Sequence, residues 1–296
     1  SAAGLYLKSM EQAVLQAKGA ECGLAITDKK RAAESWNPAD FANDLDPAHK
    51  NRHVVFISGR HAYLKDVADS AERCRSSGFA NVAAVTGDGG MQPPPREKKR
   101  LHHTDSIHIL NQLQSRGDGF FFAGAAANPF KYTPASIFPQ YCKIMKKIRR
   151  GTSFLICQSG WDMIKLQELR WYLEMREQHI SLLSRITLLT PESADDIGKG
   201  RRPGIFISND LAHILRKESQ YGLSQFTAAQ WRRIQIQAAG ARLLGYSGVV
   251  VEGLERPEHV QTVCSKVADS FAEMKTFDDW KEAYLEYLSR ADMAPY

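Results

Sequence analysis

The 296-residue chain lacks several features that would place it in a specialised class of protein. It contains no run of about 18 apolar residues, which a membrane-spanning helix requires. Its amino end has no apolar segment of the kind found in secretory signals. It begins at Ser1 without a methionine, so we expect a processed or trimmed chain. Its five cysteines include no C-x-x-C pair, so we expect free thiols rather than a disulfide framework or a structural zinc site.

The common motifs of nucleotide and hydrolase chemistry are also missing. No G-x-G-x-x-G follows an apolar strand and opens a helix, no G-x-x-x-x-G-K-[ST] loop is present, and no G-x-S-x-G elbow occurs. Aromatic residues do not alternate with basic ones, so we expect no nucleic-acid partner. His102, His103 and His108 lie where a helix is expected to open, at Thr104 and Asp105, and we predict no metal site there.

The chain does have a moderate excess of positive charge. Lysine and arginine number 39 against 33 aspartates and glutamates, which gives a formal net charge of +6. Such an excess suits anionic ligands, but alone it does not identify one.

Short apolar runs alternate with stretches of helical periodicity along most of the chain. The runs predict seven strands, at residues 23–27, 53–57, 82–85, 119–125, 153–156, 185–189 and 248–251. Most start about 30 to 37 residues apart, the length of a strand–helix unit. The runs are continuously apolar rather than alternating, which is typical of parallel strands covered on both faces. A further short strand is predicted at residues 204–207.

This pattern predicts an α/β protein with the (β/α)8 barrel fold, also called a TIM barrel, whose first strand is missing or lies upstream of this chain. Residues 4–7 are a candidate remnant of that strand, although they are too short to count as one, and a helix with an apolar face opens the chain. An open, doubly wound sheet is the competing architecture, since it accommodates seven strands. We expect a single barrel over residues 1–275 and a helical extension over 276–296, with an amphipathic helix at 278–291.

Polar residues follow the first five predicted strands at the point where the apolar run stops. In a parallel α/β protein, ligands bind at this carboxyl end of the strands. A single such residue is commonly a helix cap, but a series around one ring favours a binding site. The series includes Thr27, Thr86, Asp88, Asn128 and Gln158.

A basic helix precedes Gln158. Lys143, Lys146 and Lys147 share one face of it by their three- and four-residue spacing. That face either neutralises an anionic ligand such as a diphosphate or is a solvated surface or partner contact, and the spacing does not decide between them.

Three segments resemble the methylenetetrahydrofolate reductase family, in the order in which that family has them. Residues 79–88 (FANVAAVTGD) resemble the family's strand ending in T-G-D, and residues 124–130 (GAAANPF) resemble its G-x-A-x-N-P-F. Residues 147–158 (KIRRGTSFLICQ) resemble its K-x-x-A-G-A-x-F-x-x-T-Q. The likeness extends over roughly residues 5–270 at low identity, so the chain resembles a divergent member.

The resemblance implies a flavoprotein oxidoreductase of one-carbon metabolism, in which hydride passes through FAD to methylenetetrahydrofolate. Carried over by position, Asp88 and Gln158 are the catalytic candidates, beside the flavin and the folate pterin respectively. The implied FAD-binding positions are Thr27, Thr86, Asp88, Asn128, Lys143 and Lys147.

Two departures from the family pattern motivate an alternative function. The family's first-strand glutamate has no counterpart, because Glu11 lies in the following helix, and the family's strand-two histidine position is Phe56. The chain could therefore have lost FAD and serve as a catalytically degenerate barrel, a structural or accessory subunit of a larger, mitochondrial complex. A barrel enzyme with another small-molecule substrate is a third reading.

Partners and compartment follow from these hypotheses. We expect a folate substrate, assembly as a homo-oligomer or with partner subunits, and no membrane span. Reduced cysteines favour the mitochondrial matrix or the cytoplasm.

Overall fold

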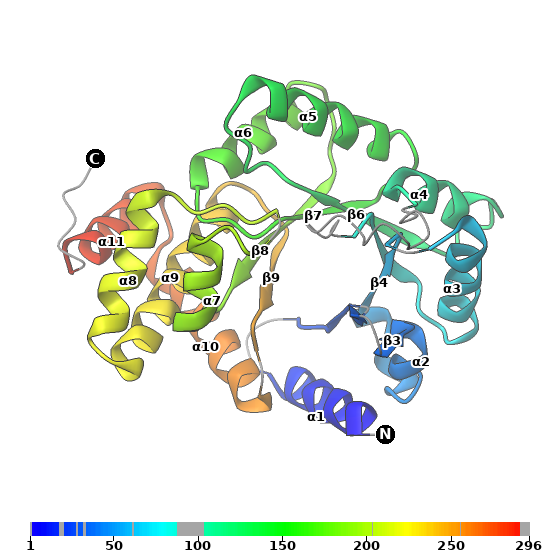
Figure 1. Cartoon of the computed structure of the whole chain (residues 1–296), viewed down its shortest axis with the longest axis horizontal. Helices are drawn as coiled ribbons and strands as arrows, with labels where there is room; N and C mark the ends of the chain where they lie inside the picture. Colours follow the sequence, from blue (N-terminus) through cyan, green and yellow to red (C-terminus); the bar gives the residue numbers. More distant parts are fainter. Residues whose placement is uncertain are drawn as a thin grey trace, which may run out of the picture. The chain divides into compact units, whose positions relative to one another are not determined.

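The computed structural model describes residues 2–17, 21–27, 29–31, 34–60, 62–87, 104–202, 204–254 and 256–290. Seven strands in it form one sheet (Figure 1), in the order β1–β4–β5–β6–β7–β8–β9. These strands are β1 (Ala25–Ile26), β4 (Val54–Ser58), β5 (Asn81–Val85), β6 (Phe122–Ala127), β7 (Phe154–Cys157), β8 (Ser181–Thr187) and β9 (Gly248–Glu252). All seven predicted strands are confirmed.

The strand order decides between the two predicted architectures. Each strand lies beside the next one of this sheet in the chain, and the pairs β1–β4, β4–β5, β5–β6 and β8–β9 are parallel. A doubly wound sheet reverses its order at a switch point, whereas a barrel adds every strand on the same side. The fold class is therefore that of an α/β TIM-like barrel, with seven strands in the described residues.

Helices connect the strands as the apolar periodicity predicted. They are α1 (Ala2–Gln16), α2 (Pro38–Ala42), α3 (Leu64–Ser76), α4 (Ser106–Gln114), α5 (Pro134–Ile148), α6 (Met163–Glu174), α7 (Pro191–Gly198), α8 (Asn209–Gln220), α9 (Leu223–Leu243), α10 (Pro257–Glu273) and α11 (Phe277–Arg290), with a 3-10 turn η1 (Pro47–Arg52). Several begin at a polar cap; the Asp105 carboxylate, for example, accepts the Ile107 N–H at 2.9 Å and starts α4.

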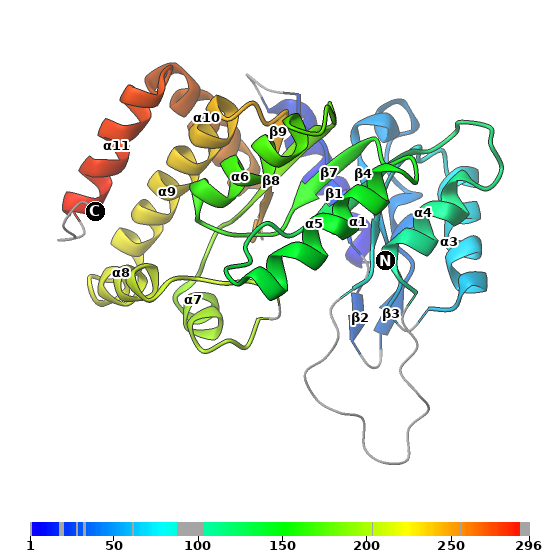
Figure 2. The same ribbon diagram turned by 90° about the horizontal axis from the view of Figure 1, so that it is seen from above.

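Two local expectations were wrong, and one pair of strands was not predicted. Residues 4–7 are not the remnant of a strand, because they lie within α1. Residues 204–207 form no strand; they make a turn and an irregular segment before the Ser208 cap of α8. A short antiparallel pair, β2 (Lys29–Arg31) with β3 (Glu34–Trp36), was not predicted and stands as a separate ribbon (Figure 2). The predicted division into a barrel and a carboxyl-terminal extension stays a prediction.

The chain divides into two compact units, which are described separately below. Unit 1 comprises residues 1–16, 21–127 and 133–156, and unit 2 comprises residues 17–20, 128–132 and 157–296. The core of unit 1 includes Val55, Val82, Ala83 and Ala84, none of which is exposed.

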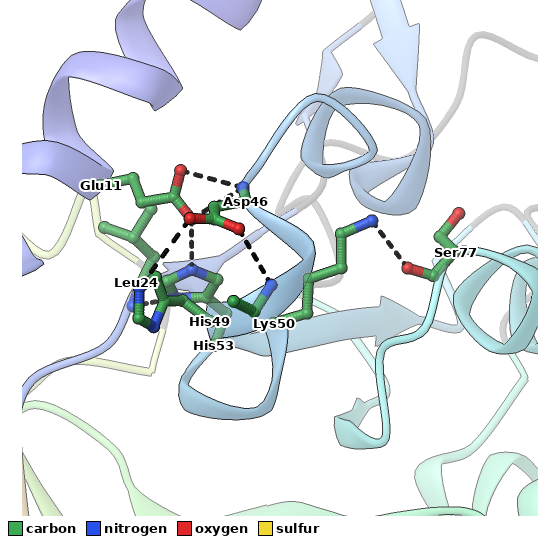
Figure 3. A network of polar contacts seen from close by, with 8 residues as sticks. Glu11, Leu24, Asp46, His49, Lys50, His53 and Ser77 are labelled. Carbon is green, nitrogen blue, oxygen red and sulfur yellow. Dashed lines mark hydrogen bonds and ion pairs between the residues drawn. The ribbon is translucent and has the colours of Figure 1, made fainter.

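A buried polar cluster fixes the amino end of β4 in unit 1 (Figure 3). The Leu24 N–H donates to Nδ1 of His53 at 3.1 Å, so that nitrogen has no proton and Nε2 must hold the ring hydrogen. Nε2 lies 3.0 Å from Oε1 of Glu11, on α1, and the Glu11 carboxylate also accepts the Asp46 N–H. Because this cluster lies at the end of the strands that does not bind ligands in barrels, its role is structural.

A second buried polar cluster joins three helices of unit 2. The Arg233 guanidinium on α9 donates to Glu218 on α8 at 2.6 Å, and the Tyr287 hydroxyl on α11 donates to the same carboxylate at 2.9 Å. The apolar core around it includes Ile236, Ala239 and Met274.

Gly240 on α9 allows α11 to pack closely. A Cβ at this position would lie 2.6 Å from Cε of Met163 and 2.8 Å from Nε1 of Trp280. That indole N–H donates to the Ile236 carbonyl at 2.8 Å. Only glycine leaves room for this contact between helices.

Candidate functional site

The carboxyl end of β5, in unit 1, carries the first of the predicted site residues. Thr86 follows β5, and its hydroxyl accepts the Ser106 N–H at 3.2 Å. It therefore fixes the first turn of α4 against β5. Its predicted cofactor contact stays a prediction, and its observed contact is with the protein itself.

Lys143 and Lys147 lie on α5 and are both engaged within unit 1. The Lys143 ammonium contacts the Asp105 carboxylate at 2.5 Å, and both side chains are about one-third exposed. Lys147 is only 6% exposed and donates to the Ala126 carbonyl, at the end of β6. The spacing of the lysines along the sequence left open whether this helix face contacts a ligand or solvent. In the structure Lys143 forms an ion pair and Lys147 is buried in the interior.

Two ionisable groups of this cluster, Lys147 and Asp105, have shifted pKa values. Burial lowers the pKa of Lys147 to about 8, with the positive charge of Lys143 acting in the same direction and Asp105 opposing it. Burial raises the pKa of Asp105, but the hydrogen bonds from the Ile107 N–H and from Lys143 outweigh it and hold that pKa below its usual value.

Two further predicted residues of unit 1 give less information. Thr27 follows β1 and is exposed. Asp88, the principal catalytic candidate, lies outside the described residues, so its predicted place beside a flavin stays a prediction.

The carboxyl ends of β7, β8 and β9 carry a hydrogen-bonded group of five residues in unit 2, which we call the strand-end network. It consists of Gln158, Ser159, Arg185, Thr187 and Glu252. Ser159 Oγ donates to Oε1 of Glu252 at 2.8 Å, and Thr187 Oγ1 lies 2.6 Å from the same oxygen. Register explains the meeting, because Thr187 pairs with Glu252 across β8 and β9.

Arg185 links the two ends of this network. It lies on the same face of β8 as Thr187, since alternate residues of a strand share a face. Its Nη1 donates to Oε1 of Gln158 at 3.0 Å and lies 3.8 Å from Oε2 of Glu252. The guanidinium is thus placed between an amide and a carboxylate.

Asn128 and Gln158, both predicted site residues, approach the same turn. Asn128 Oδ1 accepts the Phe130 N–H at 3.1 Å, and its Nδ2 donates to the Gly204 carbonyl at 3.3 Å. Gly204 has a φ of +77°, and a Cβ there would lie 3.0 Å from Nε2 of Gln158. The glycine therefore leaves the space into which the Gln158 amide projects.

Sequence reasoning missed Arg185, Thr187, Ser159 and Glu252 as site residues. A signal was present: Arg185 and Thr187 interrupt an apolar run at alternate positions, and Glu252 ends the Val249–Val251 run. The sequence does not reveal the register of β8 against β9, which brings these residues together.

A cavity of about 430 Å³ opens elsewhere in unit 2, between α8, α9 and α11, which lie side by side (Figures 1 and 2). It is lined by residues that include Lys217, Glu218, Arg232 and Tyr287. Glu218 is paired with Arg233, and Arg232 with Glu273 at 2.7 Å. These pairs stabilise the helices around the cavity.

Within the described part of the chain, no three histidine, cysteine, aspartate or glutamate side chains are placed to hold a metal ion. No helix among the described residues is both long and apolar enough to cross a bilayer.

Comparison with known proteins gives a likeness of fold. No family model and no curated protein matches the sequence. A solved structure of an uncharacterized protein from Clostridium thermocellum, which binds two copies of 5-methyl-5,6,7,8-tetrahydrofolic acid, is similar with a TM-score of 0.62 at 12% identity. The match covers 91% of this chain and 89% of that one. It supports the barrel fold across nearly the whole chain.

Proposed function

We propose that this protein binds a reduced folate at the carboxyl ends of β7–β9, through the strand-end network. The observation that carries the proposal is the Gln158 amide, held by Arg185 and Ser159 beside the Glu252 carboxylate. A pterin ring presents a carbonyl next to N–H donors, and this network offers N–H donors next to a carboxylate acceptor. The folate bound by the Clostridium thermocellum protein, and the resemblance of residues 147–158 to a folate-binding motif, support the same ligand.

The finer proposal is flavin-dependent reduction of methylenetetrahydrofolate, in which FAD would supply the hydride. The described residues do not fit the FAD diphosphate in their present arrangement. Lys147 is buried against a backbone carbonyl, and Lys143 is paired with Asp105. Binding FAD through these positions requires Lys143 to exchange its partner.

The engagement of both lysines within the protein favours a second candidate function. In this candidate the barrel is non-catalytic, with or without a bound folate, and acts as an accessory subunit. In that case the two lysines stabilise the helix layer rather than a cofactor. The reductase and the accessory subunit differ in whether flavin copurifies with the protein.

The test is calorimetric titration of the purified chain with 5-methyltetrahydrofolate, preceded by a visible absorption spectrum for flavin. We expect folate binding that weakens at least tenfold in Gln158→Ala, about 1.4 kcal/mol, because the variant loses a hydrogen bond to the ring. Gln220→Ala, an exposed glutamine on α8, is the matched control and should bind as the wild type does.

Two results separate the candidates. A flavin band together with folate binding supports the reductase, whereas folate binding without flavin supports the accessory role. An absence of folate binding, or equal binding by Gln158→Ala and wild type, would overturn the proposed site.

A further inference from the structure

The direction of the Gln158 amide is fixed by its neighbours. Its Oε1 lies 3.0 Å from Nη1 of Arg185 and 3.1 Å from the Ser159 backbone nitrogen. Both of these groups can only donate, so the atom between them must be the amide oxygen. Nε2 therefore projects the other way, toward Gly204, and its two hydrogens meet no acceptor within the described residues.

The opposite end of the strand-end network accepts hydrogen bonds. Oε1 of Glu252 is occupied by the hydroxyls of Ser159 and Thr187. Oε2 lies 3.8 Å from Arg185, which is an ion-pair distance but too long for a hydrogen bond. Because the Glu252 side chain is 39% exposed, Oε2 can accept a hydrogen bond from a ligand.

We propose that Arg185 is a positioning residue that makes Gln158 a hydrogen-bond donor, so that the site selects pteridine rings with an oxygen at C4 over rings with an amino group there. This inference rests on the proposed function. The 4-oxo ring offers a carbonyl to Gln158 and its N3–H to Glu252. A 4-amino ring places an N–H against the Gln158 donor and an unprotonated N3 against the carboxylate, so it is mismatched at both contacts.

The experiment compares tetrahydrofolate with its 4-amino-4-deoxy counterpart, which differs only at C4. Dissociation constants of both ligands are measured by calorimetry for the wild type and each variant, and the result is their ratio. A ratio cancels any uniform loss of affinity that a variant suffers. We expect the wild type to bind the 4-oxo ligand at least tenfold more tightly.

Two substitutions separate positioning from charge. Arg185→Met removes one of the two donors that fix the amide and leaves the Ser159 N–H alone to orient it. Gln158 can then turn its oxygen outward more readily, and we expect the ratio to fall to less than a third of the wild-type value. Arg185→Lys restores an obligate donor and should restore the preference. Arg290→Met, at a side chain 75% exposed on α11, is the control for loss of one positive charge and should keep the wild-type ratio.

The outcomes are distinguishable. Folate binding with no preference at C4, or an unchanged ratio in Arg185→Met, would overturn this inference and leave the proposed function standing. Binding of neither ligand by the wild type would overturn both. If a melting curve shows that Arg185→Met is unfolded, Arg185→Gln replaces it, because its amide can donate or accept and should also lower the ratio; an unchanged ratio there would refute the inference as well.

Discussion

The Lys147 side chain has an ammonium group in a place that favours a neutral amine. It is 6% exposed, it donates a hydrogen bond to the Ala126 carbonyl, and its pKa is lowered to about 8 mainly by burial. In the unfolded chain its pKa is near 10.5, so the unfolded state binds the proton more tightly. The charged form of Lys147 therefore costs folding stability at neutral pH.

This predicts a rise in stability with pH that belongs to one side chain. Between pH 8 and pH 10.5 the unfolded chain holds a proton on Lys147 that the folded chain has released, so the contribution of Lys147 to the free energy of unfolding increases there, by up to roughly 3 kcal/mol. The measurement is urea unfolding of wild type and Lys147→Met at pH 7.5, 9 and 10.5. The wild type should gain on the variant as pH rises, and a constant difference across this range would refute the shifted pKa.

At the scale of elements, the cluster of Glu11 and His53 joins α1, the segment before β1 and the start of β4. Both side chains are nearly fully buried, at 5% and 0% exposure. If the carboxylate is removed, the ring N–H of His53 and the backbone N–H of Asp46 are left without their acceptor. Unsatisfied buried donors cost more than the hydrogen bonds themselves contribute.

We therefore expect Glu11→Ala to lower the free energy of unfolding by about 2–4 kcal/mol, and Glu11→Gln, which keeps an acceptor, to lower it less. Glu72→Ala is the matched control, because Glu72 forms an exposed ion pair with Arg116 and should contribute less than about 1 kcal/mol. The readout is the urea midpoint. Equal losses for Glu11→Ala and Glu72→Ala would show that the cluster has no special role.

Elements were predictable from sequence where their side chains meet an apolar environment on both faces. Val54–Ile57 and Phe154–Cys157 are continuous apolar runs, and both are central strands. Lys29–Arg31 is entirely basic, and a short strand outside the main sheet needs no apolar run, so this strand gave no signal. β8 begins at Ser181, four residues before the predicted start. The prediction missed these residues because Ser181 and Ser184 interrupt the apolar pattern of the strand.

The candidate site was predictable only in part, because some of its residues belong to local motifs and others meet only in the folded sheet. Gln158 and Asn128 belong to local motifs, and such motifs can be recognised in the chain. Arg185 and Glu252 are 67 residues apart and acquire a shared role through strand register, which no local pattern records. Lys147 was predicted to line a cofactor, but spacing along a helix does not reveal which side chain is covered by the sheet.

At the scale of the whole molecule, the exposure of the five cysteines shows which parts of the fold are closed to solvent. Cys74, Cys157 and Cys264 are buried, Cys22 and Cys142 are partly exposed, and all five are free thiols. Burial raises the pKa of both Cys74 and Cys157 to about 12, so their reactive thiolate forms are scarce at neutral pH.

A thiol-reactive disulfide reagent should therefore label at most two cysteines rapidly in the native protein and all five in denaturant. Cys22→Ser with Cys142→Ser should remove the rapid phase, and Cys74→Ser should leave it unchanged. Mass spectrometry of the labelled peptides identifies the sites. Rapid native labelling of Cys74 or Cys157 would contradict the packing around β7 and α3.

The missing side chain at Gly240 bears on where this protein can be cut. Residues 276–296 resemble an appendage in the sequence, and an expression clone designed by pattern alone would stop before Phe277. The truncated product would expose the notch that Trp280 fills and leave the Ile236 carbonyl to water. α11 thus packs directly on α9, and a truncated protein that keeps this contact has to end after Arg290.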